Sequence, residues 1–128
     1  MYSPVAYVLA AWLLIYVPIP VAGFFRAKLD GGYDNRHPRA QQAQLSGVAA
    51  RAIGAHNNTL EAFPAFAAAA ILCAWRGVDG GAADALSIGF LAARVVYVGF
   101  YLGNLATLRS LTWFAAAGCT LGLFLQAV

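Results

Sequence analysis

The sequence predicts an all-α integral membrane protein, a bundle of four transmembrane helices in up-down-up-down order built from a single domain, residues 1–128. Two observations carry this prediction. Hydrophobic residues make up 62% of the chain and charged residues only 10%, against roughly 25% charged in soluble domains. The apolar residues also fall into four runs, and each run is close to the ~20 residues that a helix needs to cross a bilayer.

The first run, about residues 4–25, contains no charge, and Pro18 and Pro20 are expected to kink its second half. Five of the eight basic residues lie within or at the ends of the following 26–50 segment: Arg26, Lys28, Arg36, Arg39 and Arg51. By the positive-inside rule this segment is cytoplasmic, so both termini of a four-span chain lie outside. Basic residues gathered between apolar runs also exclude a nucleic-acid-binding function.

The other three helices are expected at about 51–75, 82–104 and 109–127. Pro64 lies inside the second of them, so a bend is expected there. A glycine-rich loop follows Trp75, and a tight turn at 105–108 separates the last two helices. The two cysteines lie inside apolar runs, where a thiol usually acts as a small hydrophobic side chain.

Two of these apolar helices carry a polar stripe at helical spacing. The first consists of Arg51, Gly54, Asn58 and Glu61, and the second of Arg94, Tyr97, Tyr101 and Asn104. Polar groups inside a membrane are costly unless they face other helices or a wet cavity. Either these groups only satisfy one another and hold the helices together, or they line a binding site.

The predicted helix ends place both stripes in the cytoplasmic half of the membrane. Glu61 and Arg94 each lie ten residues in from that side, roughly 15 Å by helical rise, so their opposite charges are expected to pair. With Arg26, Lys28 and Arg109 at the rim, the result is a cationic pocket for an anionic polar ligand beside an apolar one.

Arg109 opens the last helix, where a guanidinium can stabilise a thiolate or an oxyanion. The alternative is an arginine that only reaches to the membrane interface. For Tyr97 and Tyr101 the alternative is packing or an aromatic belt. His56 is interpreted as a structural hydrogen-bonding residue, and no metal site is expected.

The pattern Arg51-x4-His56-Asn57-Asn58-x2-Glu61-x2-Pro64 resembles the second-helix signature of the MAPEG family, membrane-associated proteins in eicosanoid and glutathione metabolism. Gly23-x-x-Arg26-x-Lys28 is similar to the end of the family's first helix. Arg94-x-x-Tyr97-x3-Tyr101, followed by Arg109-Ser110, is similar to its third helix and the start of the fourth. The likeness covers almost the whole chain. It favours a bacterial-type member of the family, for which the expected location is the bacterial inner membrane.

The resemblance implies a homotrimer that binds glutathione as co-substrate between neighbouring subunits near the cytoplasmic face. The implied glutathione-binding set is Arg26, Lys28, Arg51, Asn58, Glu61, Arg94, Tyr97 and Tyr101. In the family, the arginine at the position of Arg109 holds the thiolate, and the serine at the position of Ser110 lies near the sulfur. Arg109, Tyr101 and Ser110 are therefore the expected catalytic residues. The eicosanoid enzymes of the family commonly carry an arginine where this chain has Gly54 and a basic residue where it has Asn57.

Three functions follow as hypotheses. The first is a glutathione-dependent transferase or peroxidase that acts on lipophilic electrophiles supplied by membrane lipid. The second is a binding or structural membrane module that keeps the fold without catalysis, which Gly54 and Asn57 favour somewhat. The third is a small transporter or channel, which would need polar groups through the outer half of the bundle as well.

Overall fold

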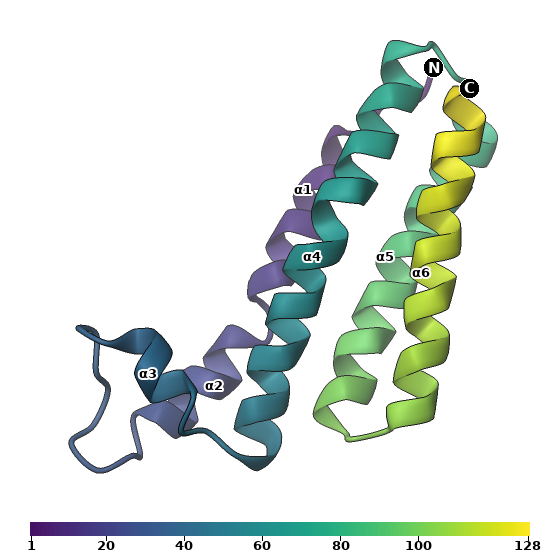
Figure 1. Ribbon diagram of the computed structural model, residues 1–128. Helices are drawn as coiled ribbons and strands as arrows, with labels where there is room; N and C mark the ends of the chain where they lie inside the picture. Colours follow the sequence, from purple (N-terminus) through teal and green to yellow (C-terminus); the bar gives the residue numbers. More distant parts are fainter.

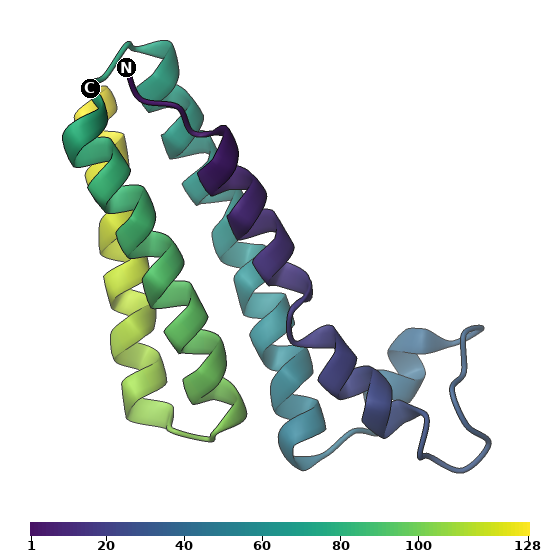
Figure 2. The same ribbon diagram turned by 180° about the vertical axis from the view of Figure 1, so that it is seen from behind.

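The computed structural model describes all residues, 1–128, and every long element is helical. The elements in chain order are α1 (Val5–Tyr16), α2 (Ile19–Arg26), α3 (Pro38–Gln42), α4 (Gly47–Trp75), α5 (Gly80–Leu102) and α6 (Ala106–Ala127). Four spans are long and apolar enough to cross a membrane, with α1 and α2 together forming the first. Both termini lie at the same end of the bundle, as the up-down-up-down order requires (Figures 1 and 2). The predicted fold class is confirmed.

The first span is broken at Val17–Pro18 rather than smoothly bent. Pro18 and Pro20 have no N–H, so the carbonyls of Leu14 and Tyr16 lose the donors that a continuous helix would supply. The Val17 N–H turns back to the Leu14 carbonyl at 3.3 Å. His56 on α4 contacts the intervening Ile15 carbonyl through its Nδ1, at 2.7 Å. A carbonyl only accepts, so Nδ1 carries the proton, and the structural role expected of His56 is confirmed.

The predicted helix boundaries shift by a few residues. Helix α4 begins at Gly47, four residues before the expected start, and its 29 residues span ~43 Å by helical rise, which exceeds the ~30 Å hydrocarbon core. Helix α5 ends at Leu102, so Asn104 belongs to the following turn, where its φ is 60°. Asparagine tolerates this left-handed conformation better than most residues. Helix α6 therefore begins at Ala106, three residues earlier than expected, and Arg109 lies in its first turn.

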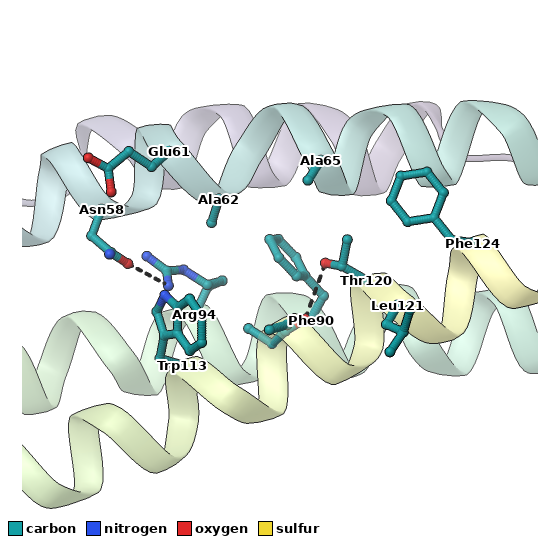
Figure 3. A pocket seen from close by; sticks show the side chains of 12 residues that line it. Asn58, Glu61, Ala62, Ala65, Phe90, Arg94, Trp113, Thr120, Leu121 and Phe124 are labelled. Atoms are coloured by element: carbon teal, nitrogen blue, oxygen red, sulfur yellow. Dashed lines mark hydrogen bonds between the residues drawn. The ribbon is translucent and has the colours of Figure 1, made fainter.

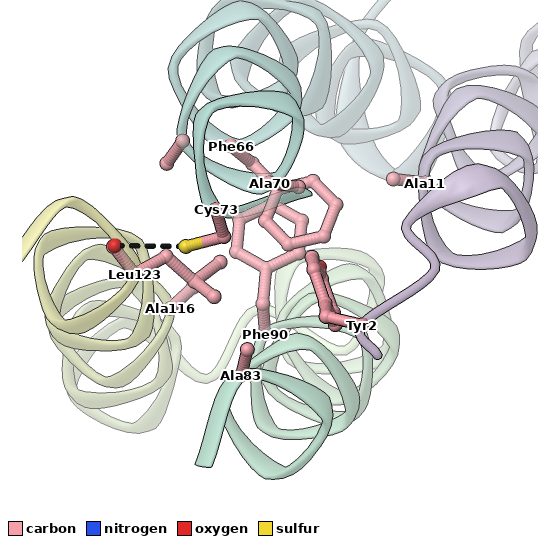
Figure 4. Close-up of a cluster of buried hydrophobic side chains, with 10 residues drawn as sticks. Tyr2, Ala11, Phe66, Ala70, Cys73, Ala83, Phe90, Ala116 and Leu123 are labelled. Atoms are coloured by element: carbon pink, nitrogen blue, oxygen red, sulfur yellow. Dashed lines mark hydrogen bonds between the residues drawn. The ribbon is translucent and has the colours of Figure 1, made fainter. Parts of the chain in front are cut away.

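The hydrophobic core fills the half of the bundle that holds the termini (Figure 4). Phe66 of α4 and Phe90 of α5 stack face to face with ring centroids 3.9 Å apart. Small residues bring the last two helices together, since a Cβ on Gly122 would meet Leu86 at 3.0 Å. Cys73 is a free, buried thiol whose Sγ lies 3.1 Å from the Leu123 carbonyl oxygen.

In the half of the bundle that holds the termini, two polar side chains of α5 pair with the N-terminal segment. The hydroxyls of Tyr2 and Ser87 lie 2.6 Å apart, and the Tyr7 hydroxyl donates to the Asp84 carboxylate at 3.0 Å. Asp84 and Ser87 are therefore not free to line a path across the bundle.

The segment between α2 and α4 projects away from α5 and α6 (Figures 1 and 2). Arg26 organises it: its Nε donates to Gln41 Oε1, its Nη1 to the Tyr33 hydroxyl and its Nη2 to the Asp34 carbonyl, each at 2.9 Å. Gln41 closes the loop by donating to the Gly32 carbonyl at 2.6 Å. The segment is thus tied to the end of α2, and the short helix α3 within it was not predicted.

Candidate functional site

Five of the predicted site residues line one cavity of about 340 Å³ in the half of the bundle opposite the termini: Asn58, Tyr97, Tyr101, Arg109 and Ser110. Trp113 and Phe114 complete its wall. The residues come from three helices, α4, α5 and α6. Tyr97 and Tyr101 reach the cavity together because residues four apart lie on the same face of a helix. Arg109 and Ser110 reach it because the turn after Leu102 folds the first turn of α6 back against the end of α5.

Cations and aromatic rings alternate in and next to this cavity. The Arg94 guanidinium lies 4.0 Å from the centre of the Tyr97 ring, and the Arg109 guanidinium lies 4.5 Å from that of Tyr101. The two tyrosine rings meet edge to face, 5.6 Å apart. A guanidinium over a ring face is attracted by the ring quadrupole. The Tyr101 ring therefore holds the Arg109 guanidinium at the wall of the cavity.

No carboxylate neutralises either arginine. The single salt-bridge contact of the chain joins Asp34 and His37 in the connecting segment, at 3.5 Å, and it is an ion pair only when His37 is protonated. The cavity wall consequently offers an arginine, hydroxyl groups and an amide, but no acid. Hydrogen-bond donors without a fixed acceptor suit an anion.

Gly54 allows Tyr101 to occupy its position. A Cβ added at Gly54 would overlap the Tyr101 hydroxyl and would lie 2.8 Å from the ring carbon Cζ. The glycine on α4 therefore provides the space into which Tyr101 of α5 packs. The sequence marked Gly54 as the loss of a cation, whereas in the structure it is part of the wall behind the site.

The expected ion pair between Glu61 and Arg94 is wrong for this chain. Arg94 is 1% exposed, and it donates from Nη1 to Asn58 Oδ1 at 3.1 Å and from Nη2 to Thr59 Oγ1 at 2.8 Å. Figure 3 shows the Glu61 carboxylate on the far side of Asn58 from the Arg94 guanidinium. Equal depth in the membrane does not fix the direction in which a side chain points around its helix. Arg94 instead contacts Asn58 and Thr59, which precede Glu61 on α4 by three and two residues.

Arg94 therefore orients Asn58. A guanidinium only donates, so Asn58 turns its Oδ1 to Arg94 and has its Nδ2 free to donate. Thr59, which the sequence reasoning missed, relays the contact by donating to the Ala55 carbonyl at 2.8 Å. Thr59 could have been predicted from the sequence because it directly follows Asn58 on the helix face that turns toward α5.

Three predicted ligand residues line neither this cavity nor the adjoining one that Glu61 and Arg94 line. Arg51 donates from Nε to the Leu102 carbonyl at 3.0 Å and so caps the end of α5. Arg26 spends its three donor groups on the connecting segment. Lys28 lies 4.0 Å over the Phe24 ring on the same side of the molecule as Arg26.

A second cavity of about 420 Å³ adjoins the first, and Asn58 and Trp113 line both. Glu61 and Arg94 stand at its polar end, and the rest of the wall is mostly apolar (Figure 3). Trp113, one turn after Arg109, was not predicted. The spacing of Arg109, Trp113 and Thr120 along one face of α6 was the available signal.

Comparison with known proteins identifies the family of the chain. Residues 3–128, essentially the whole chain, match the family model described as MAPEG family. No curated protein and no solved structure matched the chain. With four membrane-spanning helices and a family match over nearly its full length, this chain belongs to the MAPEG family.

Proposed function

We propose that this protein is a membrane-embedded glutathione-dependent transferase or peroxidase that acts on lipophilic electrophiles. Its family membership supports chemistry of this general kind. The observation that carries the proposal is the position of Arg109, which is held over Tyr101 beside Ser110, Asn58 and Tyr97, with no acid to neutralise it.

In this proposal the thiol of glutathione binds next to Arg109 and reacts as the thiolate. A free thiol has a pKa of about 8.5, so a site without positive charge would hold little thiolate at cytoplasmic pH. A guanidinium a few ångströms away favours the charged form and lowers the thiol pKa by about 1–3 units. The thiolate then forms a bond to an electrophilic carbon, and the leaving group departs with its electron pair.

Tyr97, Tyr101 and Asn58 would complete the site. Each tyrosine hydroxyl can donate to the sulfur or to a peptide carbonyl of glutathione, and Asn58 Nδ2 is free to donate as well. Ser110 donates to the Ala106 carbonyl at 3.1 Å, so its hydroxyl would have to leave this bond to donate to a thiolate.

We also propose a homotrimer in which a neighbouring subunit completes the site. Arg26 and Lys28 lie on the α2 side of the chain, away from the α5–α6 pair that carries Arg109. Trp113 and Phe114, at the mouth of the cavity, are 41% and 66% exposed. The α2 end of a second subunit would bring cations to this mouth and cover the aromatic side chains. The cytoplasmic side of the membrane is the proposed side of glutathione entry.

Two alternatives remain as outcomes of the test. A non-catalytic module would keep the cavity without thiolate chemistry, but the explanation of Gly54 as space for Tyr101 removes one reason to favour it. A channel would need free polar groups in the outer half, where Asp84 and Ser87 are already paired.

The test is a pair of measurements on protein purified in neutral detergent. Isothermal titration with glutathione reports binding, and conjugation to a chlorinated nitrobenzene reports turnover. Wild type should do both, Arg109→Ala should lose most of the turnover, and Arg39→Ala should behave as wild type because Arg39 is exposed on the connecting segment. Equal turnover in wild type and Arg109→Ala would refute the assigned role, and absence of both signals in wild type would favour the non-catalytic module.

A further inference from the structure

The last turn of α5 ends beside the proposed thiol site, and one of its carbonyl groups depends on a side chain of another helix. A helix leaves its last four carbonyls without partners inside the helix. The carbonyls of residues 99–101 accept from the N–H groups of residues 103–105, at 2.9–3.2 Å. The remaining carbonyl belongs to Leu102, and Arg51 of α4 donates to it from Nε at 3.0 Å. Arg51 thus completes the cap of α5.

Arg51 does not hold the end of α5 alone. The first turns of α4 lie at the same end of the bundle as the turn between α5 and α6 (Figure 1). Arg51 and Gly54 are three residues apart, so they lie on one face of α4. Arg51 contacts the Leu102 backbone. Gly54 leaves the space that the Tyr101 side chain occupies. Neighbouring positions on α4 therefore hold two successive residues of α5.

The turn after α5 carries this placement to Arg109. Only residues 103–105 separate the two helices, because α5 ends at Leu102 and α6 begins at Ala106. The Arg109 N–H donates to the Leu105 carbonyl at 2.9 Å, which closes the first turn of α6. The Arg109 guanidinium in turn lies over the Tyr101 ring, which belongs to α5. Its position therefore depends on how the end of α5 and the start of α6 are joined.

We propose that Arg51 is a positioning residue, which fixes the end of α5 and the turn that hold Arg109 beside Tyr101, and which does not itself bind glutathione. The resemblance implied a ligand, but Arg51 lines neither cavity. Without its donor the Leu102 carbonyl loses its partner, the turn loosens, and Arg109 is less often beside the thiol. For the reaction this inference rests on the proposed function, whereas the capping of α5 does not.

The test separates a ligand from a positioning residue. A ligand of the peptide part of glutathione sets the affinity for S-methylglutathione, which has no thiol to ionise. A residue that positions Arg109 sets the pKa of the bound thiol, which the ultraviolet thiolate signal reports when pH is varied at saturating glutathione. Arg51→Met keeps the apolar stem and removes the donor. It should raise the pKa of the bound thiol by about one unit and change the affinity for S-methylglutathione by less than about threefold.

Two variants control for the loss of an arginine. Arg76→Met is matched, because Arg76 donates to the Val128 backbone oxygen at 3.3 Å, at the other end of the bundle. It should change neither quantity. Arg51→Lys keeps the charge and one donor, so it should restore part of the lowered thiol pKa. An unchanged thiol pKa in Arg51→Met would overturn the proposal. If the affinity for S-methylglutathione also fell about tenfold, Arg51 would be a ligand.

Hydrogen exchange tests the capping without glutathione. Exchange in residues 103–109 should be faster in Arg51→Met than in wild type and in Arg76→Met, and equal exchange would overturn the capping. Faster exchange in a protein that binds no glutathione would contradict the proposed function and leave the capping supported. If Arg51→Met does not fold, Asn104→Ala strains the same turn, since φ is 60° there and alanine tolerates this conformation poorly. It should raise the bound thiol pKa as well, and an unchanged pKa would overturn the proposal.

Discussion

Substitution of Gly54 by alanine should disrupt the site through a single added carbon. The new Cβ would overlap the Tyr101 hydroxyl and lie 2.8 Å from Cζ of the ring. The contact involves the rigid end of an aromatic side chain whose face also supports Arg109 at 4.5 Å. Tyr101 must therefore move, and Arg109 loses the ring that holds it over the cavity.

The size of the effect follows from two opposing contributions. Overpacking a well-filled site costs about 1–3 kcal/mol, while glycine to alanine in a helix stabilises by up to about 1 kcal/mol. Gly99 is the matched control, because it lies in α5 and a Cβ there meets nothing within 4 Å. Since the helix contribution is common to both, Gly54→Ala should be about 1–3 kcal/mol less stable than Gly99→Ala.

Thermal unfolding in detergent measures this difference, which corresponds to a midpoint separated by roughly 3–12 °C. Combining Gly54→Ala with Tyr101→Ala removes the overlap, so the double variant should be more stable than the sum of the single effects predicts. Gly54→Ala should also lower turnover with a chlorinated nitrobenzene, and Gly99→Ala should not. Equal midpoints for Gly54→Ala and Gly99→Ala, or additive effects in the double variant, would refute the packing of Tyr101 against Gly54.

Three further outcomes are expected. Arg26→Gln should expose residues 27–46 to limited proteolysis, because Arg26 supplies three hydrogen bonds that tie this segment to α2; cleavage no faster than in wild type would contradict that role. Backbone N–H groups of His37 and Arg36 lower the pKa of the Asp34 carboxyl below its usual 3.8. The turn at residues 34–37 should therefore persist at neutral pH and be lost only as the pH falls below about 4. Asp34→Ala should speed hydrogen exchange of the His37 and Arg36 amides at neutral pH. Glu61→Gln should change the free energy of unfolding by less than about 0.5 kcal/mol, since Glu61 is exposed and unpaired. Arg94→Gln removes contacts to Asn58 and Thr59 and should cost more. A large loss of stability in Glu61→Gln would show that Glu61 does pair with Arg94.

The spans and the place of the site could be predicted because they depend on properties visible along the chain. Long apolar runs located the membrane helices, and Pro18 and Pro20 located the break in the first. Spacing along α5 placed Tyr97 and Tyr101 on one face, and depth placed both beside the start of α6. Five predicted residues accordingly meet in one cavity.

The partners of individual side chains could not be predicted in the same way. Arg94 and Glu61 agree in depth but not in direction, and Arg94 binds an amide and a hydroxyl instead. Arg26 looked like a free cation because its partners, Tyr33 and Gln41, belong to a loop whose path no periodicity reveals. Gly54 looked like a missing charge because the space it leaves matters only once Tyr101 is placed against it.

The central claim is that Arg109 stabilises a glutathione thiolate in the cavity formed by α4, α5 and α6. The most direct measurement is the ultraviolet difference spectrum of thiolate when glutathione is added to the purified protein at neutral pH. A thiolate signal that saturates with glutathione in wild type and in Arg39→Ala, and that vanishes in Arg109→Ala while glutathione still binds, is the predicted result. A thiolate signal of full size in Arg109→Ala, or glutathione bound to wild type only as the thiol, would contradict the claim.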